Sequence, residues 1–338
     1  MRIAIVGAGA IGGYLAVRLA EAGTDVTVIA RGANLEAIRK DGLRLAGEDG
    51  GETVARDLAT AASPAEAGPH DAVLLTVKAH QVGPIAGDLA ALCHDGTSIV
   101  TMQNGIPWWY FHDHGGALAG TRLQTADPGG AIAAHVDAAR VIGCVVYPAA
   151  ILEAPGVVRV IEGNRFGLGE LSGAMTDRVQ ALSQILAKAG FRAPVTKDIR
   201  AEIWLKLWGN LSLNPVSALT HATLVDLCEF EPTRSLIAAM MAEARDVAGA
   251  LGVTFKLGID KRIEGARKVG AHKTSMLQDV EAGRPIELDA LVGSVIELGR
   301  LTDIATPHID AVHACMQMLT RRIAEAGHGL RLGQGGDA

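Results

Sequence analysis

The N-terminal stretch Met1–Arg31, MRIAIVGAGAIGGYLAVRLAEAGTDVTVIAR, carries the strongest structural signal in this sequence. An apolar run, Ile3–Val6, leads directly into Gly7–Gly12, and a helical pattern follows over Ile11–Ala22. A second apolar run, Val26–Ile29, comes next. Strand, glycine-rich turn, helix and strand in this order predict the first βαβ unit of a dinucleotide-binding sheet.

The glycines of this turn have separate predicted roles. Gly7 permits a tight turn, Gly9 lets backbone approach a pyrophosphate, and Gly12 allows the helix to pack closely on the strand. The helix N-terminus adds amide donors and a positive dipole end. A glycine-rich turn without a ligand is the alternative reading. The predicted cofactor-binding residues here are Gly7, Ala8, Gly9, Ala10, Ile11 and Gly12.

The residues that follow the second strand distinguish between cofactors. NAD sites usually place Asp or Glu there to bind the ribose hydroxyls. This sequence has Ala30 and Arg31 instead. A guanidinium offers several donors and a permanent charge to a 2′-phosphate. Arg31 therefore favours NADP(H), and a solvated surface arginine is the alternative reading.

Further apolar runs extend the alternation of strands and helices. Ala72–Val77 and Ser98–Thr101 are typical of buried parallel strands, because they are nearly continuous and do not alternate with polar residues. Helical patterns lie over Leu35–Lys40, Pro84–Leu92 and Thr176–Ala189. Three more strands are expected to be antiparallel and to extend the sheet: Arg140–Tyr147, Val157–Ile161 and Phe166–Leu168.

After Asp198 only helical patterns remain. They cover Asp198–Leu213, Thr233–Leu251, Ile259–Val269, Glu287–Thr302 and Pro307–Ala326. The predicted fold class is therefore α/β, with an N-terminal Rossmann-type doubly wound sheet followed by an all-helical C-terminal domain. We expect an NADP-binding domain over residues 1–196, a substrate and catalytic domain over 197–326, and a flexible tail over 327–338.

Composition excludes several classes of protein. Of 338 residues, 49% are hydrophobic and 20% are charged, which excludes a disordered chain. The net charge is −6 without a Lys/Arg run, so a nucleic-acid partner is not expected. Four scattered cysteines indicate free thiols in a reducing compartment. No apolar stretch reaches membrane-spanning length and no signal peptide is recognisable, which predicts a cytoplasmic protein without a membrane partner.

Polar residues also follow two of the predicted strands at their carboxyl ends. Lys78 comes after Ala72–Val77, and Asn104 comes after Ser98–Thr101. Ligands of open α/β sheets dock at this edge, so Lys78 is expected near a phosphate or the reacting centre and Asn104 near the cofactor. Ordinary turn residues are the alternative.

One apolar helical segment carries a polar stripe. Lys206, Asn210 and Asn214 recur every fourth residue and so share one helix face. Burying them would cost several kcal/mol without polar partners, which a cleft between domains would supply. The alternative is a snorkelling lysine with capping amides. Pro215 is expected to end or kink this helix at Asn214.

Two further segments contain candidate residues. Ser275 is a donor for a carboxylate or hydroxyl, and Glu287 could orient substrate or Lys206, with simple helix capping as the alternative for both. Within the aromatic stretch Ile106–His114, His112 and His114 are separated by Asp113 alone. No third ligand is evident, so a metal site is not predicted.

Together these motifs resemble the ketopantoate reductase (2-dehydropantoate 2-reductase) family to about Ala326. The resemblance rests on GAGAIG, Arg31, VKAHQ at Val77–Gln81, QNG at Gln103–Gly105, the Lys206 stripe with Pro215, and SMLQD from Ser275 followed by Glu287. It implies that Lys206 is catalytic with assistance from Glu287. Lys78, Gln81 and Asn104 would contact the cofactor, and Asn210, Asn214 and Ser275 would bind substrate.

The implied activity is NADPH-dependent reduction of 2-dehydropantoate to pantoate by hydride transfer to the 2-ketone, in pantothenate and coenzyme A biosynthesis. The sequence departs from the pattern in its aromatic stretch and in Val216–Asp226, which lacks an expected asparagine. A related reductase with Trp108, Trp109 and Tyr110 covering a bulkier 2-oxo acid or ketone is therefore one alternative. A non-catalytic dinucleotide-binding sensor is another. The resemblance permits a homodimer.

Overall fold

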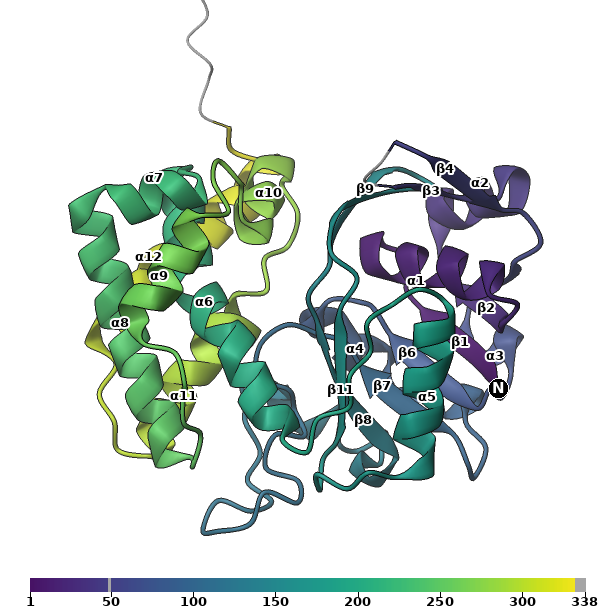
Figure 1. The fold of residues 1–338 in the computed structure, drawn as a ribbon, viewed down its shortest axis with the longest axis horizontal. Coiled ribbons are helices and arrows are strands. Elements are labelled where there is room, and N and C mark those ends of the chain that lie inside the picture. The colour runs from purple at the N-terminus through teal and green to yellow at the C-terminus, as the bar shows by residue number, and fades with distance from the viewer. Residues whose placement is uncertain (48–49, 332–338) are drawn as a thin grey trace, which may run out of the picture. The chain divides into compact units, whose positions relative to one another are not determined.

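The computed structural model describes residues 1–47 and 50–331. The described chain forms two compact units (Figure 1). The first comprises Met1–Arg122 and Asp127–Glu202, and the second comprises Leu123–Ala126 together with the chain from Ile203 onward. The short segment Leu123–Ala126 thus belongs to the second unit although both of its neighbours belong to the first.

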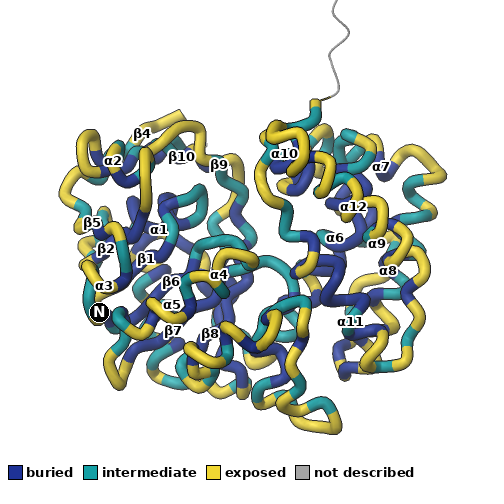
Figure 2. The backbone as a smooth tube through the Cα atoms, turned by 180° about the vertical axis from the view of Figure 1, so that it is seen from behind, coloured by how far each residue is buried: buried dark blue, intermediate teal, exposed yellow. Residues whose placement is uncertain are grey.

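The first unit is built on a seven-stranded sheet with the order β11-β8-β7-β6-β1-β2-β5. Its central strands are buried, as the dark backbone in Figure 2 shows. Every neighbouring pair is parallel except β11 and β8. The strands are β1 (Arg2–Val6), β2 (Asp25–Ile29), β5 (Ala59–Ala61), β6 (Ala72–Leu75), β7 (Ser98–Thr101), β8 (Val141–Val146) and β11 (Phe166–Glu170).

Two predictions about the later strands were wrong. β8 extends the sheet but runs parallel to β7, and only β11 is antiparallel. β10 (Val157–Glu162) does not join this sheet. It lies in a second sheet with the order β4-β3-β10-β9, formed with β3 (Leu43–Ala46), β4 (Glu52–Ala55) and β9 (Ala149–Ala154). The partner strand β3 precedes β10 by a long stretch of chain, so no local pattern indicates the pairing.

The small sheet covers one side of α1 (Ala10–Glu21), as Figure 1 shows. A Cβ atom at Gly13 would lie 2.6 Å from Cγ2 of Val158 on β10, so only glycine allows this close contact. The other helices of this unit are α2 (Gly32–Asp41), α3 (Pro64–Ala67), α4 (Ala79–Ile85), α5 (Asp177–Lys188) and 3₁₀ helices over Ala86–Leu92, Pro128–Gly130 and Ala138–Arg140. The segment predicted as helix from Pro84 therefore begins earlier, at Ala79.

In the part of the second unit that the structure describes, all regular elements are helical. They are α6 (Ile199–Thr220), which starts in the first unit, α7 (Leu224–Glu229), α8 (Glu231–Ala250), α9 (Ile259–Arg267), α10 (Ser275–Ala282), a π-helical turn over Asp289–Gly293, α11 (Ser294–Leu301) and α12 (Pro307–Ala326). Of the two predicted effects of Pro215, an end of the helix does not occur, because α6 continues to Thr220. Residues 211–218 are all buried, and this packing outweighs the hydrogen bond that proline cannot donate.

The first part of the predicted flexible tail has a defined contact with the helical unit. Gly327 ends α12 in the left-handed conformation, with φ at 71°. The following backbone lies on α10, where Leu330 N donates to Val280 O at 3.1 Å. The rest of that tail, residues 332–338, lies outside the described residues. Among the helices that the structure describes, none is long and apolar enough to cross a membrane.

Candidate active site

The glycine turn between β1 and α1 has the geometry of a phosphate cradle. Gly7 adopts φ of 106°, which side chains disfavour. A Cβ at Gly12 would lie 1.9 Å from Gly7 O and 2.5 Å from Thr76 Oγ1, so helix and turn are in direct backbone contact. Thr76 Oγ1 donates to Gly7 O at 2.7 Å. Contacts with Gly12 of the helix and with Thr76 therefore fix the conformation of the turn.

The N-terminus of α1 is suited to an anion. Its N-cap residue is Gly9, which has no side chain to cap the helix, and a Cβ there would meet no atom within 4 Å. The first turn contains no acidic residue. Amide donors and the positive dipole end are thus available to a diphosphate, as the dinucleotide-binding turn requires.

Sequence reasoning missed a residue that holds this turn from the side. Asn34 on α2 donates from Nδ2 to Ala8 O at 2.6 Å, and its Oδ1 accepts from Gly156 N at 2.7 Å. The side chain thus joins the glycine turn to the loop before β10. The only local signal is an amide side chain in the first turn of the helix after β2, which does not identify its distant partners.

Arg31 lies at the carboxyl end of β2, as the N-cap residue of α2. Its side chain is exposed, and the first turn of α2 contains no acidic residue. A permanent positive charge therefore lies beside the N-terminal end of a second helix, at the same sheet edge as the glycine turn.

The ends of β6 and β7 are joined by the first side chain of the QNG motif, to which the sequence pattern assigns no role. Gln103 donates from Nε2 to Leu75 O at 2.7 Å and to Val77 O at 3.0 Å. These bonds hold the turn that carries half-buried Asn104 against the turn that carries half-buried Lys78. Both predicted residues consequently lie at the carboxyl edge of the sheet, next to the glycine turn.

Gln81 has a local structural contact. It is exposed on the first turn of α4, and its Oε1 accepts a hydrogen bond from Lys78 N at 3.0 Å. The carboxamide therefore caps α4 and fixes the backbone from which the Lys78 side chain extends.

In the second unit, α6 carries the predicted polar stripe as one continuous helix. Lys206 and Asn210 are half-buried, and Asn214 is 7% exposed. The neighbouring Trp204 and Trp208 are fully buried. Both tryptophans thus belong to the core, and the polar stripe is a distinct feature of one face.

Ser275 and Glu287 lie at helix starts, but neither is the N-cap of α10. That role belongs to Thr274, whose Oγ1 accepts from Leu277 N at 3.2 Å. Ser275 is the exposed first residue of α10. Glu287 is half-buried and precedes the π-helical turn, a feature that often marks functional sites.

The aromatic stretch, which one alternative prediction placed over a bulkier substrate, is largely core. Trp109 and Tyr110 are 2% and 0% exposed. Trp109 donates from Nε1 to Thr101 Oγ1 at 2.9 Å. A Cβ at Gly143 would lie 3.0 Å from the Trp109 ring. Both rings therefore belong mainly to the core, although Trp109 also borders a pocket.

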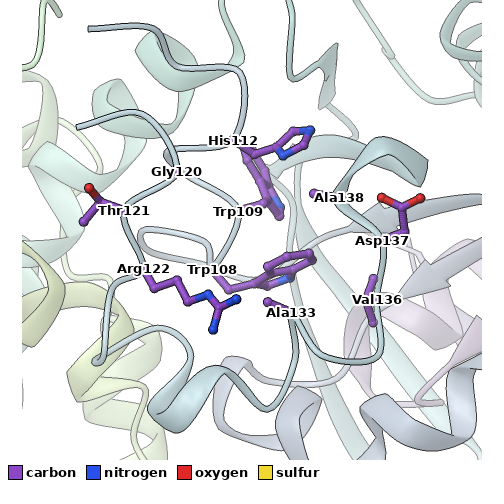
Figure 3. A pocket seen from close by; sticks show the side chains of 10 residues that line it. All are labelled: Trp108, Trp109, His112, Gly120, Thr121, Arg122, Ala133, Val136, Asp137 and Ala138. Carbon is purple, nitrogen blue, oxygen red and sulfur yellow. The ribbon is translucent and has the colours of Figure 1, made fainter. Parts of the chain in front are cut away.

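Trp108 and Trp109 both line a pocket of about 250 Å³ within the first unit, where Trp108 lies next to the Arg122 side chain (Figure 3). His112 also lines this pocket, and its Nε2 lies 3.6 Å from Asp113 Oδ2. His114 packs against Phe111, with ring centroids 5.0 Å apart. Over residues 1–47 and 50–331, no three His, Cys, Asp or Glu side chains are grouped to hold a metal ion.

Comparison with known proteins agrees with this geometry. Residues 3–109 match the family model "Ketopantoate reductase PanE/ApbA", and residues 198–320 match "Ketopantoate reductase PanE/ApbA C terminal". A 2-dehydropantoate 2-reductase from Mesorhizobium japonicum is 57% identical over 96% of this chain and 98% of its own length.

Solved structures share the fold over similar lengths. A candidate ketopantoate reductase from Ralstonia solanacearum superposes with a TM-score of 0.91 at 39% identity, over 96% of this chain and 98% of its own. D-mandelate dehydrogenase, solved with NADH and anilino(oxo)acetate, gives a TM-score of 0.82 at 21% identity, over 96% and 99%. The second likeness shows a common fold alone. From the two family matches and the relative at 57% identity, it follows that this chain belongs to the ketopantoate reductase family.

Proposed function

We propose that this protein catalyses the NADPH-dependent reduction of 2-dehydropantoate to pantoate in the cytoplasm. The observation that carries the proposal is the 57% identity to a 2-dehydropantoate 2-reductase over 96% of this chain. The glycine turn, Arg31 and the polar stripe of α6 supply the chemical groups that this reaction needs.

The first unit fits a dinucleotide. Backbone amides of Gly7–Gly12 and of the N-terminus of α1, which has no side-chain cap, would hold the diphosphate. Lys78, Gln81 and Asn104, at the carboxyl edge of the same sheet, would contact the remainder of the cofactor. When bound, the nicotinamide supplies the hydride, and the protein supplies orientation and charge.

Arg31 supports NADPH as the preferred cofactor. The D-mandelate dehydrogenase structure contains NADH, so this fold also accepts a dinucleotide without a 2′-phosphate. The choice must then depend on local residues. The guanidinium at the end of β2 complements a phosphate, whereas a carboxylate there would repel it.

Residues of the helical unit would act on the substrate. The Lys206 ammonium would donate a hydrogen bond to the ketone oxygen and then protonate the developing alkoxide. Glu287 would orient and stabilise that ammonium. Asn210, Asn214 and Ser275 would bind the substrate carboxylate and hydroxyl groups, since amides and hydroxyls can donate to both.

Steady-state kinetics with 2-dehydropantoate test the proposal, with NADPH oxidation followed by the loss of nicotinamide absorbance. We expect Lys206→Ala to lower kcat by about 10²- to 10⁴-fold, the usual contribution of a positioned acid, while NADPH affinity stays unchanged. Lys188→Ala is the matched control, because Lys188 is exposed in the last turn of α5. An unchanged kcat in Lys206→Ala would refute the assigned role.

A panel of other 2-oxo acids and ketones tests the choice of substrate. Preferred turnover of a compound other than 2-dehydropantoate would assign the reaction to a related reductase. Tight NADPH binding without turnover of any compound in the panel would instead indicate a sensor.

A further inference from the structure

The start of α6 packs closely against glycines of β8 and β11. Gly143 and Gly169 face each other across this antiparallel pair. A Cβ at Gly143 would lie 2.7 Å from Cγ1 of Ile199, and one at Gly169 would lie 2.9 Å from its Cβ. Any larger side chain at either position would push the first turn of α6 away from the sheet.

The carboxylate of Glu202 extends this contact. Gly167 lies on the same face of β11 as Gly169, and a Cβ there would be 3.2 Å from Glu202 Oε1. Glu202 Oε1 accepts a hydrogen bond from Tyr147 Oη at 2.9 Å and forms an ion pair with Arg165 Nη2 at 2.5 Å. Its side chain is 15% exposed, so the carboxylate is largely removed from water and depends on these two partners.

The two partners also hold each other. The Arg165 guanidinium lies over the Tyr147 ring, 4.5 Å from the centroid, in a cation–π contact. Burial and the hydrogen bond to Glu202 raise the pKa of Tyr147 to about 12, so its hydroxyl remains a donor at physiological pH. Tyr147, Arg165 and Glu202 therefore form a closed cluster.

This cluster lies at the functional edge of the sheet. Tyr147 directly follows β8, and β8 is the parallel neighbour of β7, whose carboxyl end carries Asn104. Arg165 directly precedes β11, which is antiparallel to β8, so it lies at the same edge. Along this edge, β7 separates the strand that Tyr147 follows, β8, from the strand that Lys78 follows, β6.

Glu202 and Lys206 are separated by one turn of the same helix, α6. A second contact holds this helix start. Arg200 donates from Nε to Tyr110 O at 2.8 Å and from Nη1 to Leu171 O at 2.6 Å. Arg200 and Glu202 thus hold the first turn of α6, the helix that carries Lys206 one turn later.

We propose that Glu202 is a positioning residue for the reaction. Through Tyr147 and Arg165, it fixes the first turn of α6 on the sheet and thereby fixes the backbone that carries the Lys206 amine. The inference rests on the proposed function, because it assigns Glu202 a role in proton delivery by Lys206.

The chain contains a matched control. Glu170 is more deeply buried, with 4% side-chain exposure, and it likewise forms an ion pair with an arginine, Arg178, at 2.5 Å. Its second partner is also a hydroxyl, that of Thr176. This pair ties α5 to β11, and the described hydrogen bonds and ion pairs of the Glu170 carboxylate do not involve α6. Glu170→Ala therefore reports the loss of a buried carboxylate without an effect on the helix of Lys206.

The experiment compares Glu202→Ala, Glu202→Gln, Tyr147→Phe and Glu170→Ala with wild type. For Glu202→Ala we expect kcat to fall by about tenfold to a hundredfold, because a small misplacement of a reacting group lowers the rate by such factors. The KM for NADPH should stay unchanged. Glu202→Gln should recover most of the activity, because its amide oxygen can accept the same hydrogen bonds. Tyr147→Phe should give a smaller loss of kcat, and it provides the readout if Glu202→Ala does not fold.

The decisive readout is the solvent isotope effect on kcat, measured in D2O. Slower proton delivery should increase this effect in Glu202→Ala and Tyr147→Phe. In Glu170→Ala, kcat per folded enzyme and the isotope effect should both match wild type. Equal losses in Glu202→Ala and Glu170→Ala, or an unchanged isotope effect, would overturn the inference.

Lys206→Ala separates this inference from the proposed function. If wild type reduces 2-dehydropantoate, Lys206→Ala is impaired and Glu202→Ala behaves like Glu170→Ala, the inference alone is wrong. If wild type does not reduce 2-dehydropantoate, or Lys206→Ala is as active as wild type, both proposals are wrong.

Discussion

Replacing Arg31 by Ala should change the choice of cofactor without changing the reaction. Arg31 is the exposed N-cap residue of α2, at the end of β2, and the first turn of that helix contains no acid. The guanidinium would therefore be the principal cation for the 2′-phosphate of NADPH. NADH has no 2′-phosphate with which the guanidinium could form this ion pair.

The exposure of Arg31 sets the expected magnitude. A hydrogen bond to a charged group contributes about 1.5–3 kcal/mol, and an exposed ion pair in water only about 0.2–1 kcal/mol. A bidentate contact to phosphate at an exposed position should therefore lie between these ranges, at about 1.4 kcal/mol. That value corresponds to about a tenfold weaker affinity for NADPH.

Fluorescence titration of NADPH and NADH measures both dissociation constants. Arg31→Ala should raise Kd for NADPH about tenfold and leave Kd for NADH unchanged. Lys40→Ala is the control for net charge, because Lys40 is exposed on the last turn of the same helix. In wild type, added salt should reduce the preference for NADPH, since exposed charges are screened. An unchanged ratio of the two constants in Arg31→Ala would refute the reasoning.

Gly12→Ala should raise Kd for NADPH and NADH together, because its Cβ would lie 1.9 Å from Gly7 O and must displace the glycine turn; equal affinities for the variant and wild type in the same titration would contradict this. Tyr147, with a folded pKa of about 12 and a usual value of 10.0, should contribute stability that is fully present below pH 10 and is lost as pH rises towards 12. Chemical unfolding of wild type and Tyr147→Phe across that range measures it, and an equal pH dependence of the two proteins would count against it. Cys315 is exposed, whereas Cys228 is buried and burial raises its thiol pKa. A disulfide reagent should therefore modify Cys315 before Cys228. Cys315→Ser should abolish the fast phase of thiol modification.

Several site residues were predictable because their signals are local. The glycines of the turn, Arg31 and Asn104 each follow an apolar run that is recognisable as a strand, and parallel strands bring their carboxyl ends to one edge. The stripe of Lys206 on α6 follows from helical periodicity alone.

Residues that support the site were not predictable in this way. Asn34 and Gln103 act through backbone groups that are distant in sequence, and nothing near either residue indicates those partners. Glu202 looks like an ordinary acidic residue in the first turn of a helix, until the structure brings Tyr147 and Arg165 to its carboxylate.

The amino-acid sequence alone determines three features. They are the order of the parallel strands β1, β2, β6 and β7 along the chain, the glycine turn, and the helical character of the second half. These depend on hydrophobic periodicity and on the conformational freedom of glycine, which are properties of neighbouring residues. Only the tertiary structure decided that β10 pairs with β3, that β8 is parallel, that Trp109 is core and that α6 continues through Pro215. The physical reason is that each of these outcomes depends on packing against chain that is remote in sequence, and packing energy exceeds local preference.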